Sequence, residues 1–174
     1  MIPRLAARYL AVSAMALLGL FVAREDIKLT AYIPVKGDVP TIGGGTTRYE
    51  NGKPVRLGDK ITPARALMLL GKDVDVHTSG LMKCIGDIPL YQRELDAYAA
   101  LAHNVGPGAV CHSSIPTKLR AGQFSEACAT IKDFNGVCTR RAGGKCVEKR
   151  VLRGLVNARE REYKWCMGES HASQ

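Results

Sequence analysis

The alternation of hydrophobic and polar residues changes about a third of the way along the chain from a strand-like to a helix-like pattern. Apolar and polar residues alternate over residues 28–33, and several turn-forming glycines follow. This pattern predicts a small antiparallel sheet over about residues 30–60. Thr62 followed by Pro63 is typical of a helix start, because threonine caps a helix and proline fits its first turn. We therefore expect a long helix over much of residues 63–79.

Helical periodicity and turn residues predict four more helices further along. The helix predicted over about residues 90–103 should end abruptly at the Asn-Val-Gly-Pro-Gly segment 104–108, since glycine and proline do not continue a helix. A segment rich in glycine and cysteine, 135–146, is expected to be a loop. The four predicted helices cover about residues 90–103, 114–121, 124–133 and 152–165. This order of elements favours an α+β fold, in which a small β lobe precedes a larger helical lobe.

The N-terminus carries a pattern typical of exported proteins. Arg4 and Arg8 precede residues 9–23, which bear no charge, and a positive segment before an apolar run is the usual export signal. The run is short for a membrane span and is diluted by alanine, serine and glycine. These features favour an uncleaved, weakly held hydrophobic helix that anchors the chain in a membrane, over a cleaved signal peptide or a buried core helix. Either form of export places the rest of the chain outside the cytoplasm.

The length and the net charge of the chain indicate a single folded domain with a negatively charged partner. The 174 residues suit one domain, and a content of 46% hydrophobic and 24% charged residues excludes wholesale disorder. Lysine and arginine number 25 against 16 aspartate and glutamate, a formal net charge of +9. This charge favours a polyanionic partner: nucleic acid, an anionic lipid surface or an acidic cell-wall polymer.

The cysteines indicate disulfide bonds. They form an even set in the second half of the chain: Cys84, Cys111, Cys128, Cys138, Cys146 and Cys166. No C-x-x-C pair occurs and the histidines lack a regular ligand spacing, so a metal site is disfavoured. An oxidising compartment agrees with export, and disulfides are favoured over buried reduced thiols. Six cysteines allow many pairings; the closure of short loops favours Cys111–Cys128 and Cys138–Cys146, which leaves Cys84–Cys166.

One stretch after the apolar run carries a recognisable motif. Glu25 is followed four residues on by Leu29 and seven residues on by Tyr32, and the segment 41–45 then reads Thr-Ile-Gly-Gly-Gly. The glycines alone do not form a phosphate-binding loop, because the Gly-Lys-Ser/Thr ending of such a loop is missing.

Two further segments follow in order. Residues 92–106 run from a glutamine through an Asp-Ala pair to an Asn-Val-Gly turn, and residues 154–162 read Gly-Leu-Val-Asn-Ala-Arg-Glu-Arg-Glu. Together the three segments resemble the motifs of the bacteriophage-type lysozymes, the endolysins of glycoside hydrolase family 24. The resemblance covers about residues 25–166.

The resemblance implies a lysozyme-like fold with a cleft between the two lobes. It implies a muramidase that hydrolyses the β-1,4 bonds between N-acetylmuramic acid and N-acetylglucosamine in peptidoglycan and so lyses the host cell, without a cofactor or metal. Glu25 matches the family's catalytic acid, which protonates the leaving oxygen of the glycosidic bond. Tyr32 and Asn104 are implied to line the cleft.

The chain departs from the family pattern at the second catalytic group. The family has a carboxylate nine residues after the glutamate, where this chain has Pro34, and proline has no group that titrates. Asp38 lies in the same turn region and is the candidate for the base that activates water. The hydroxyl of Thr41 is expected to orient that water.

The N-terminal segment is similar to that of the signal-anchor-release subgroup of these endolysins. There, a weakly hydrophobic segment tethers an inactive enzyme to the inner membrane and later leaves the bilayer. The resemblance implies a release segment at 1–24 and a catalytic domain at 25–174, with its β lobe at about 25–62 and its helical lobe at about 63–174. It also implies a monomer, tethered at the periplasmic side of the host inner membrane and then released to the periplasm, which acts on peptidoglycan and binds no nucleic acid.

Two other functions remain open at this point. A lytic transglycosylase cleaves the same bond with one acid, because the 6-hydroxyl of the muramyl sugar replaces water, and Pro34 favours this alternative. The second is a non-enzymatic basic protein that binds nucleic acid or cell wall. The chain offers few aromatic residues for the base stacking that such nucleic-acid binders use.

Overall fold

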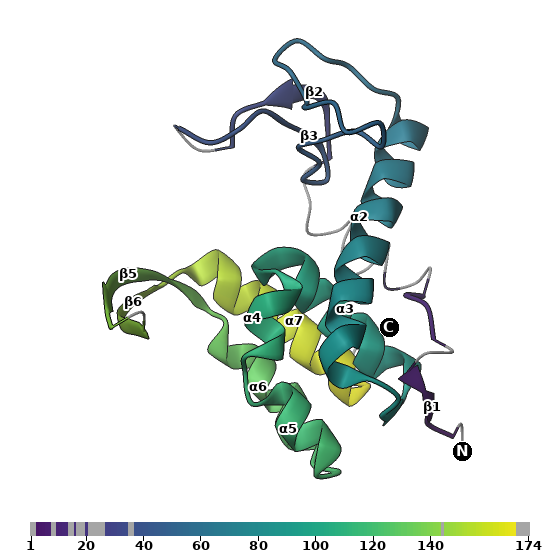
Figure 1. Ribbon diagram of the computed structural model, residues 1–174, viewed down its shortest axis with the longest axis vertical. Coiled ribbons are helices and arrows are strands. Elements are labelled where there is room, and N and C mark those ends of the chain that lie inside the picture. Colours follow the sequence, from purple (N-terminus) through teal and green to yellow (C-terminus); the bar gives the residue numbers. More distant parts are fainter. Residues whose placement is uncertain are drawn as a thin grey trace.

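The computed structural model has two lobes joined by one long helix (Figure 1). It describes residues 3–7, 10–13, 16, 20, 27–34, 37–143 and 145–169. Helix α2 (Pro63–Ile85) runs from a small β lobe at the top of the view into a larger helical lobe. The α+β order expected from the sequence is therefore confirmed.

The β lobe is a short antiparallel ladder closed by turns. Strand β2 (Lys28–Tyr32) pairs with strand β3 (Thr41–Gly43), with an irregularity in the register between their ends. Its small apolar core consists of Ala31, Ile42 and Val55. The sheet predicted over about residues 30–60 is present, but its second half, residues 44–60, contributes turns and isolated bridges rather than strands.

Helix α2 begins where the sequence predicts. The side-chain oxygen of Thr62 accepts a hydrogen bond from the backbone N–H of Arg65 at 3.2 Å, and Pro63 occupies the first turn. A threonine cap satisfies one of the N–H groups that a helix start leaves without an intrahelical partner.

The helix continues to Ile85 instead of ending near residue 79 as predicted. Gly80 lies within it, and the first residue of helix α4 (Pro107–Cys111) packs at that point. A Cβ at Gly80 would lie 2.8 Å from Cγ of Pro107, closer than side-chain atoms approach each other. Gly80 therefore permits a close contact between α2 and α4.

Helix α3 (Gln92–Val105) is the centre of the helical lobe. Residues 94–102 are all buried, and the helix contacts α2, α4 and the last helix, α7 (Arg153–Met167). It ends at Gly106, whose φ of 84° is one that glycine adopts without strain. Because α3 is covered around its circumference, its polar residues Glu94 and Asp96 need partners inside the protein.

The other predicted helices are confirmed to within a few residues. They are α5 (Ile115–Arg120), α6 (Phe124–Thr130) with the 3₁₀ turn η3 (Ile131–Asp133), and α7 (Arg153–Met167). A short helix α4 (Pro107–Cys111) was not predicted. Its proline ends the preceding helix and also fits the first turn of a new one.

The prediction of a loop at residues 135–146 is wrong. Strands β5 (Gly136–Ala142) and β6 (Lys145–Val151) form an antiparallel hairpin there. Register shifts interrupt its ladder, so the side chains lack the simple alternation that identifies a strand in a sequence. A Cβ at Gly136 would clash with the backbone carbonyl of Arg150, so this glycine permits the close approach of the strands.

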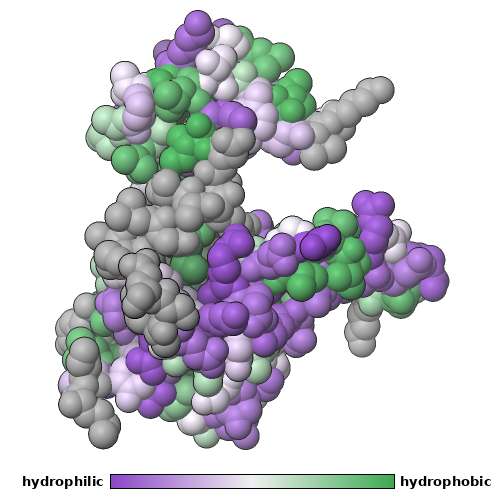
Figure 2. All heavy atoms as spheres, turned by 180° about the vertical axis from the view of Figure 1, so that it is seen from behind, coloured by the Kyte–Doolittle hydropathy of each residue, from purple (hydrophilic) through white to green (hydrophobic). Residues whose placement is uncertain are grey.

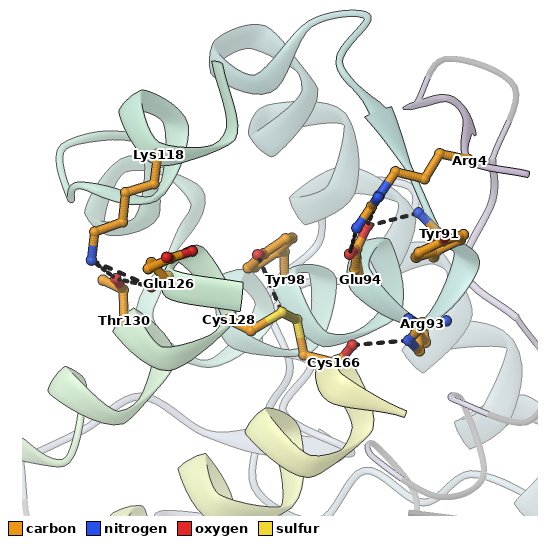
Figure 3. The surroundings of a disulfide bond; sticks show 10 residues. All are labelled: Arg4, Tyr91, Arg93, Glu94, Tyr98, Lys118, Glu126, Cys128, Thr130 and Cys166. Atoms are coloured by element: carbon orange, nitrogen blue, oxygen red, sulfur yellow. Dashed lines mark hydrogen bonds and ion pairs between the residues drawn. A yellow bond between two sulfur atoms is a disulfide. The ribbon is translucent and has the colours of Figure 1, made fainter. Parts of the chain in front are cut away.

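Three disulfides link the cysteines, with Cα–Cα separations of 5.6, 5.8 and 5.7 Å: Cys84–Cys111, Cys128–Cys166 and Cys138–Cys146. The predicted pair Cys138–Cys146 is confirmed, whereas Cys111–Cys128 and Cys84–Cys166 are wrong. The unexpected end of α2 carries Cys84 beside α4, and Cys128 of α6 faces α7 (Figure 3). Packing of the helices, rather than the shortest loop, therefore decides the pairing.

The described residues of the N-terminal segment lie against the helical lobe. Strand β1 (Leu5–Ala6) pairs with strand β4 (Pro89–Leu90), and Ala16 and Leu20 are buried in a cluster with residues of α2 and α3. Among the described residues, no helix has the length and apolar character needed to cross a membrane. The hydrophobic helix predicted over 9–23 falls largely on residues outside the described ranges.

The two buried carboxylates of α3 bind this N-terminal segment. Arg4 donates hydrogen bonds to Glu94 at 2.8 and 3.2 Å (Figure 3), and the charged pair raises the pKa of Arg4. Ser13 donates to Asp96 from its backbone N–H at 2.9 Å and from its hydroxyl at 2.7 Å. Glu94 and Asp96 are only 3% and 1% exposed. The N-terminal residues thus supply partners that these carboxylates need inside the lobe.

Loss of the buried disulfide should destabilise the fold more than loss of the hairpin disulfide. Cys128–Cys166 spans 38 residues and Cys138–Cys146 spans eight, for which chain entropy gives about 4 and about 2.5 kcal/mol. We expect Cys128→Ala/Cys166→Ala to lower the free energy of unfolding by the larger amount in urea titration. Cys138→Ala/Cys146→Ala is the matched control, and an equal or greater loss in the control would contradict this ranking.

Candidate active site

A polar cavity of about 480 Å³ lies between the two lobes. The glycine turn after β3 and the residues beyond it form one wall, and α2 and the end of α3 form the other. The lining residues are Gly44, Gly45, Thr47, Arg48, Asp73, His77, His103 and Asn104. The cavity therefore draws its side chains from both lobes and from the helix that joins them.

The turn after β3 is shaped by backbone hydrogen bonds and glycine. Ile42 and Thr46 exchange N–H to carbonyl bonds at 2.9 and 3.0 Å, which closes a tight turn. Gly43 and Gly45 have φ values of 65° and 110°, which suit glycine and strain other residues. The Thr-Ile-Gly-Gly-Gly motif therefore places bare backbone along the cavity.

One hydrogen bond ties this turn to α2. The hydroxyl of Thr46 donates to Oδ2 of Asp73 at 2.7 Å, and Thr46 is 2% exposed. A hydrogen bond to a carboxylate is stronger than one between neutral groups. This contact fixes the β lobe against the helix at the cavity wall.

Two histidines lie against each other in the cavity. The rings of His77 and His103 make an edge-to-face contact with centroids 5.2 Å apart. Nδ1 of His77 lies 2.6 Å from the backbone carbonyl of Asp73, and because a carbonyl only accepts, Nδ1 carries the proton. In the neutral ring, Nε2 is therefore an acceptor, suited to a sugar hydroxyl.

Asn104 is held in place from behind. Nη2 of Arg159 donates to Oδ1 of Asn104 at 2.9 Å, and Arg159 also pairs with Glu162 at 3.1 Å. Arg159 and Glu162 are each 1% exposed, so the arginine supports the cavity wall and does not reach solvent. Arg159 belongs to the third sequence motif and Asn104 to the second. The third motif therefore holds the cavity residue of the second motif in place.

The other predicted site residues lie apart from the described lining. Thr41 is buried in β3 and donates its hydroxyl to the carbonyl of Val39 at 3.1 Å. Tyr32 is half-buried in β2 and pairs with Thr41 across the ladder. Asp38 is exposed, and its Oδ1 accepts the N–H of Val39 at 2.8 Å. Glu25 lies outside the described residues.

Sequence reasoning thus found Asn104 of the described lining and missed Asp73, His77 and His103. Asp73 and His77 are four residues apart on α2, so the helix places them on one face. That spacing was visible in the sequence, although nothing there indicated which face meets the β lobe. Among the described residues, no three histidine, cysteine or acidic side chains gather in a way that could hold a metal ion.

A two-lobed α+β fold with a polar cavity beside its connecting helix is the architecture of the lysozyme-like glycoside hydrolases. The sequence model of the phage lysozyme family matches residues 23–162, and the chain belongs to that family. It is a lysozyme-type enzyme and a peptidoglycan-hydrolysing endolysin, as the resemblance of its motifs implied.

Relatives and solved structures agree with this assignment. The SAR-endolysin of Pseudomonas phage phiKMV is 37% identical over 90% of this chain and 89% of its own length. The SAR-endolysin of Enterobacteria phage P21 is 30% identical over 82% of this chain and 79% of its own. The endolysin of Escherichia coli O157:H7 phage FAHEc1 superimposes with a TM-score of 0.77 at 30% identity, covering 91% of this chain and 94% of that one. The lysozyme-like fold expected from the motifs is confirmed.

Removal of the Thr46 hydroxyl should loosen the junction between the lobes. We expect Thr46→Val to lower the free energy of unfolding by about 1 kcal/mol and to reduce peptidoglycan cleavage about threefold, because Asp73 loses its donor. A double-mutant cycle with Asp73→Ala, measured by urea unfolding, should give a coupling of about 0.5–1.5 kcal/mol. Thr117→Val, at an exposed position of α5, is the control. Zero coupling in the cycle would show that the bond does not join the lobes.

Proposed function

We propose that this endolysin is a muramidase that hydrolyses the β-1,4 bond between N-acetylmuramic acid and N-acetylglucosamine. The observation that carries the proposal is the polar cavity between the lobes, walled by the glycine motif and by Asn104. A glycan chain offers hydroxyl and acetamido groups, and the cavity offers imidazole, amide and carboxylate groups together with bare backbone. Membership of the phage lysozyme family supports the same reaction.

The acid in this reaction is Glu25. Glycosidic cleavage needs a protonated carboxyl group beside the leaving oxygen, and the resemblance of the first motif supports Glu25 in that role. An inverting hydrolase needs in addition a carboxylate that activates water on the opposite face of the sugar ring. We assign that base to Asp38 and the orientation of the water to the Thr41 hydroxyl. Tyr32 is proposed to contact the substrate nearby.

One observation favours a lytic transglycosylase as the second candidate. Asp38 is exposed and binds its own neighbouring N–H, and it lies apart from the described cavity lining. The position of the family's usual carboxylate is Pro34. If no second carboxylate reaches the bond, the 6-hydroxyl of the muramyl sugar attacks in place of water and a single acid suffices.

Substitution of the two carboxylates separates these candidates. We expect Glu25→Gln to abolish turbidity loss of permeabilised Gram-negative cells, by at least about 100-fold, because glutamine cannot donate the proton. Glu126→Gln, on the exposed face of α6, should retain full activity as the matched control. Asp38→Asn should lose activity if the enzyme is a muramidase with this base.

Mass spectrometry of the digested peptidoglycan gives the second readout. Reducing muramyl ends support the hydrolase, whereas anhydro-muramyl ends together with an active Asp38→Asn variant would establish the transglycosylase. A fully active Glu25→Gln variant would refute both candidates and point to a basic protein that binds cell wall without cutting it.

We also propose that residues 1–24 tether the chain to the periplasmic side of the host inner membrane before release to the periplasm, where it acts as a monomer without a nucleic-acid partner. The weak apolar character of this segment and the SAR-endolysin relatives support the proposal. The described contacts of Arg4 and Ser13 with the helical lobe belong to a released form. They would be absent while the segment lies in a bilayer.

A more apolar segment should delay release. Each added buried CH₂ is worth about 0.8 kcal/mol in a bilayer, so Ala14→Leu/Gly19→Leu should move the chain toward the membrane fraction and slow lysis of the host culture. Thr117→Leu, outside the segment, should leave the distribution unchanged. Equal amounts of wild type and the double variant in the periplasmic fraction throughout the lysis period would refute membrane tethering.

A further inference from the structure

The β lobe exposes large aliphatic side chains near the end of β2. Ile33, Val39 and Leu57 are 44%, 54% and 59% exposed. Figure 2 shows hydrophobic residues gathered over this lobe, at the top of the view. Isolated apolar residues are ordinary on a protein surface, whereas a group of them marks an interaction site. The question is therefore whether these three side chains lie together.

The pairing of β2 with β3 places two of these side chains at one end of the lobe. Tyr32, the last residue of β2, pairs with Thr41, the first residue of β3. The connection between two antiparallel strands lies beyond their last pair. Ile33 and Val39 belong to this connection, so both lie at the end of the ladder.

The turn that carries Leu57 reaches the same end along the other edge of β2. Residues 59–61 run antiparallel to β2, and the N–H of Ala31 donates to the carbonyl of Asp59 at 2.9 Å. Because the two segments run in opposite directions, residues that precede Asp59 lie toward residues that follow Ala31. Leu57 therefore lies toward Ile33. We define the β-lobe tip as Ile33, Val39 and Leu57.

The part of the chain that forms the tip has an excess of positive charge. Residues 28–60 carry six lysine or arginine residues and three aspartate or glutamate residues. Arg56 and Lys60 are both exposed. The nearby acidic residues are Asp38, which is exposed, and Asp59, whose carboxylate accepts the N–H of Arg56 at 2.9 Å. An apolar tip with this charge balance suits an anionic partner that also offers an apolar phase.

A lipid bilayer fits this combination better than a glycan. Aliphatic side chains enter the boundary between headgroups and acyl chains, and neighbouring cations are attracted to anionic lipids. Sugar hydroxyl groups would leave the same aliphatic side chains without an apolar partner. The position of the lobe in the chain supports a bilayer as well. Only four residues separate Arg24, the end of the proposed tether, from the start of β2 at Lys28, and four residues span at most about 14 Å.

We infer that the β-lobe tip docks onto the surface of an anionic phospholipid bilayer. Ile33, Val39 and Leu57 enter the interface, and Arg56 and Lys60 contact lipid phosphates. The tip is exposed while Arg4 and Ser13 bind the helical lobe, so the docking surface is available in the released form. The released chain thus keeps a weak and reversible affinity for the membrane. This last consequence rests on the proposed tether, whereas the docking surface itself does not.

The test is co-sedimentation of the full chain with vesicles made of equal parts of phosphatidylglycerol and phosphatidylcholine. We expect Val39→Thr/Leu57→Thr to lower the partition coefficient about tenfold, because threonine replaces aliphatic groups that enter the bilayer. Val76→Thr/Val151→Thr is the matched control, at positions of α2 and β6 that are 61% and 57% exposed. Each variant loses two exposed aliphatic side chains, so equal falls in the two would overturn the inference.

A second pair of variants tests the cations. We expect Arg56→Gln/Lys60→Gln to lower the partition coefficient about tenfold on the same vesicles and to leave it unchanged on pure phosphatidylcholine. Lys83→Gln/Arg161→Gln loses the same charge at exposed positions of α2 and α7 and should fall much less. An equal fall in both would show that net charge alone attracts the chain, which contradicts docking by the tip.

Other outcomes are decisive as well. Wild-type binding by Val39→Thr/Leu57→Thr refutes the tip as a lipid site and leaves the proposed tether and glycosidase standing, because neither depends on these residues. Self-association of the wild type that this variant loses, with vesicle binding unchanged, would assign the tip to a contact between copies of the chain. If the double variant unfolds at a lower temperature, Leu57→Thr alone should lower the partition coefficient about threefold, and no change in it would refute the docking surface.

Discussion

The separation of the two lobes depends on one helix. Helix α2 has 23 residues, about 35 Å of continuous backbone at 1.5 Å per residue. Near its middle, Asp73 accepts the hydrogen bond from Thr46 of the β lobe. On either side of Asp73, Leu70 and Val74 are buried against α3 and the N-terminal segment. One wall of the cavity is therefore part of a single continuous helix. The glycine turn and the end of α3 acquire their functional relation only because α2 sets the distance between them.

Local signals located five of the described helices, although they missed α4 and the end of α2, because a helix start or stop often depends on neighbouring residues. Thr62 and Pro63 specify one start, and Gly106 specifies one stop. The signals failed where distant contacts decide the structure. Gly80 lies inside a helix where Pro107 packs against it, and the hairpin at residues 136–151 carries register shifts that hide its alternation. The disulfide pairing failed for the same reason, since it follows from which helices are neighbours.

The candidate site shows the same division. The motifs identified Asn104 and the glycine turn, because each belongs to a short stretch of sequence whose spacing can be matched. Asp73, His77 and His103 come from two helices and meet only after folding. The structure also weakens the case for Asp38 as the base, because Asp38 is exposed and accepts the N–H of its neighbour Val39. No spacing rule predicts this position. The catalytic roles of Glu25, Asp38 and Thr41 and the substrate contact of Tyr32 stay predictions from the sequence.

The hydrogen bonds from Arg4 and Ser13 to the carboxylates of α3 limit how far this enzyme can be shortened at its N-terminus. Deletion of the hydrophobic N-terminal segment to improve expression would also remove the guanidinium that pairs with Glu94 and the hydroxyl that donates to Asp96. Glu94 would keep the N–H of Tyr91 and Asp96 the side-chain amide of Gln92. Glu94 would nevertheless lose its cationic partner, and removing one partner of a buried ion pair costs several kcal/mol. A trimmed version would call for isosteric replacement of both acids, for example by glutamine and asparagine, or for a short polar peptide grafted back onto strand β4.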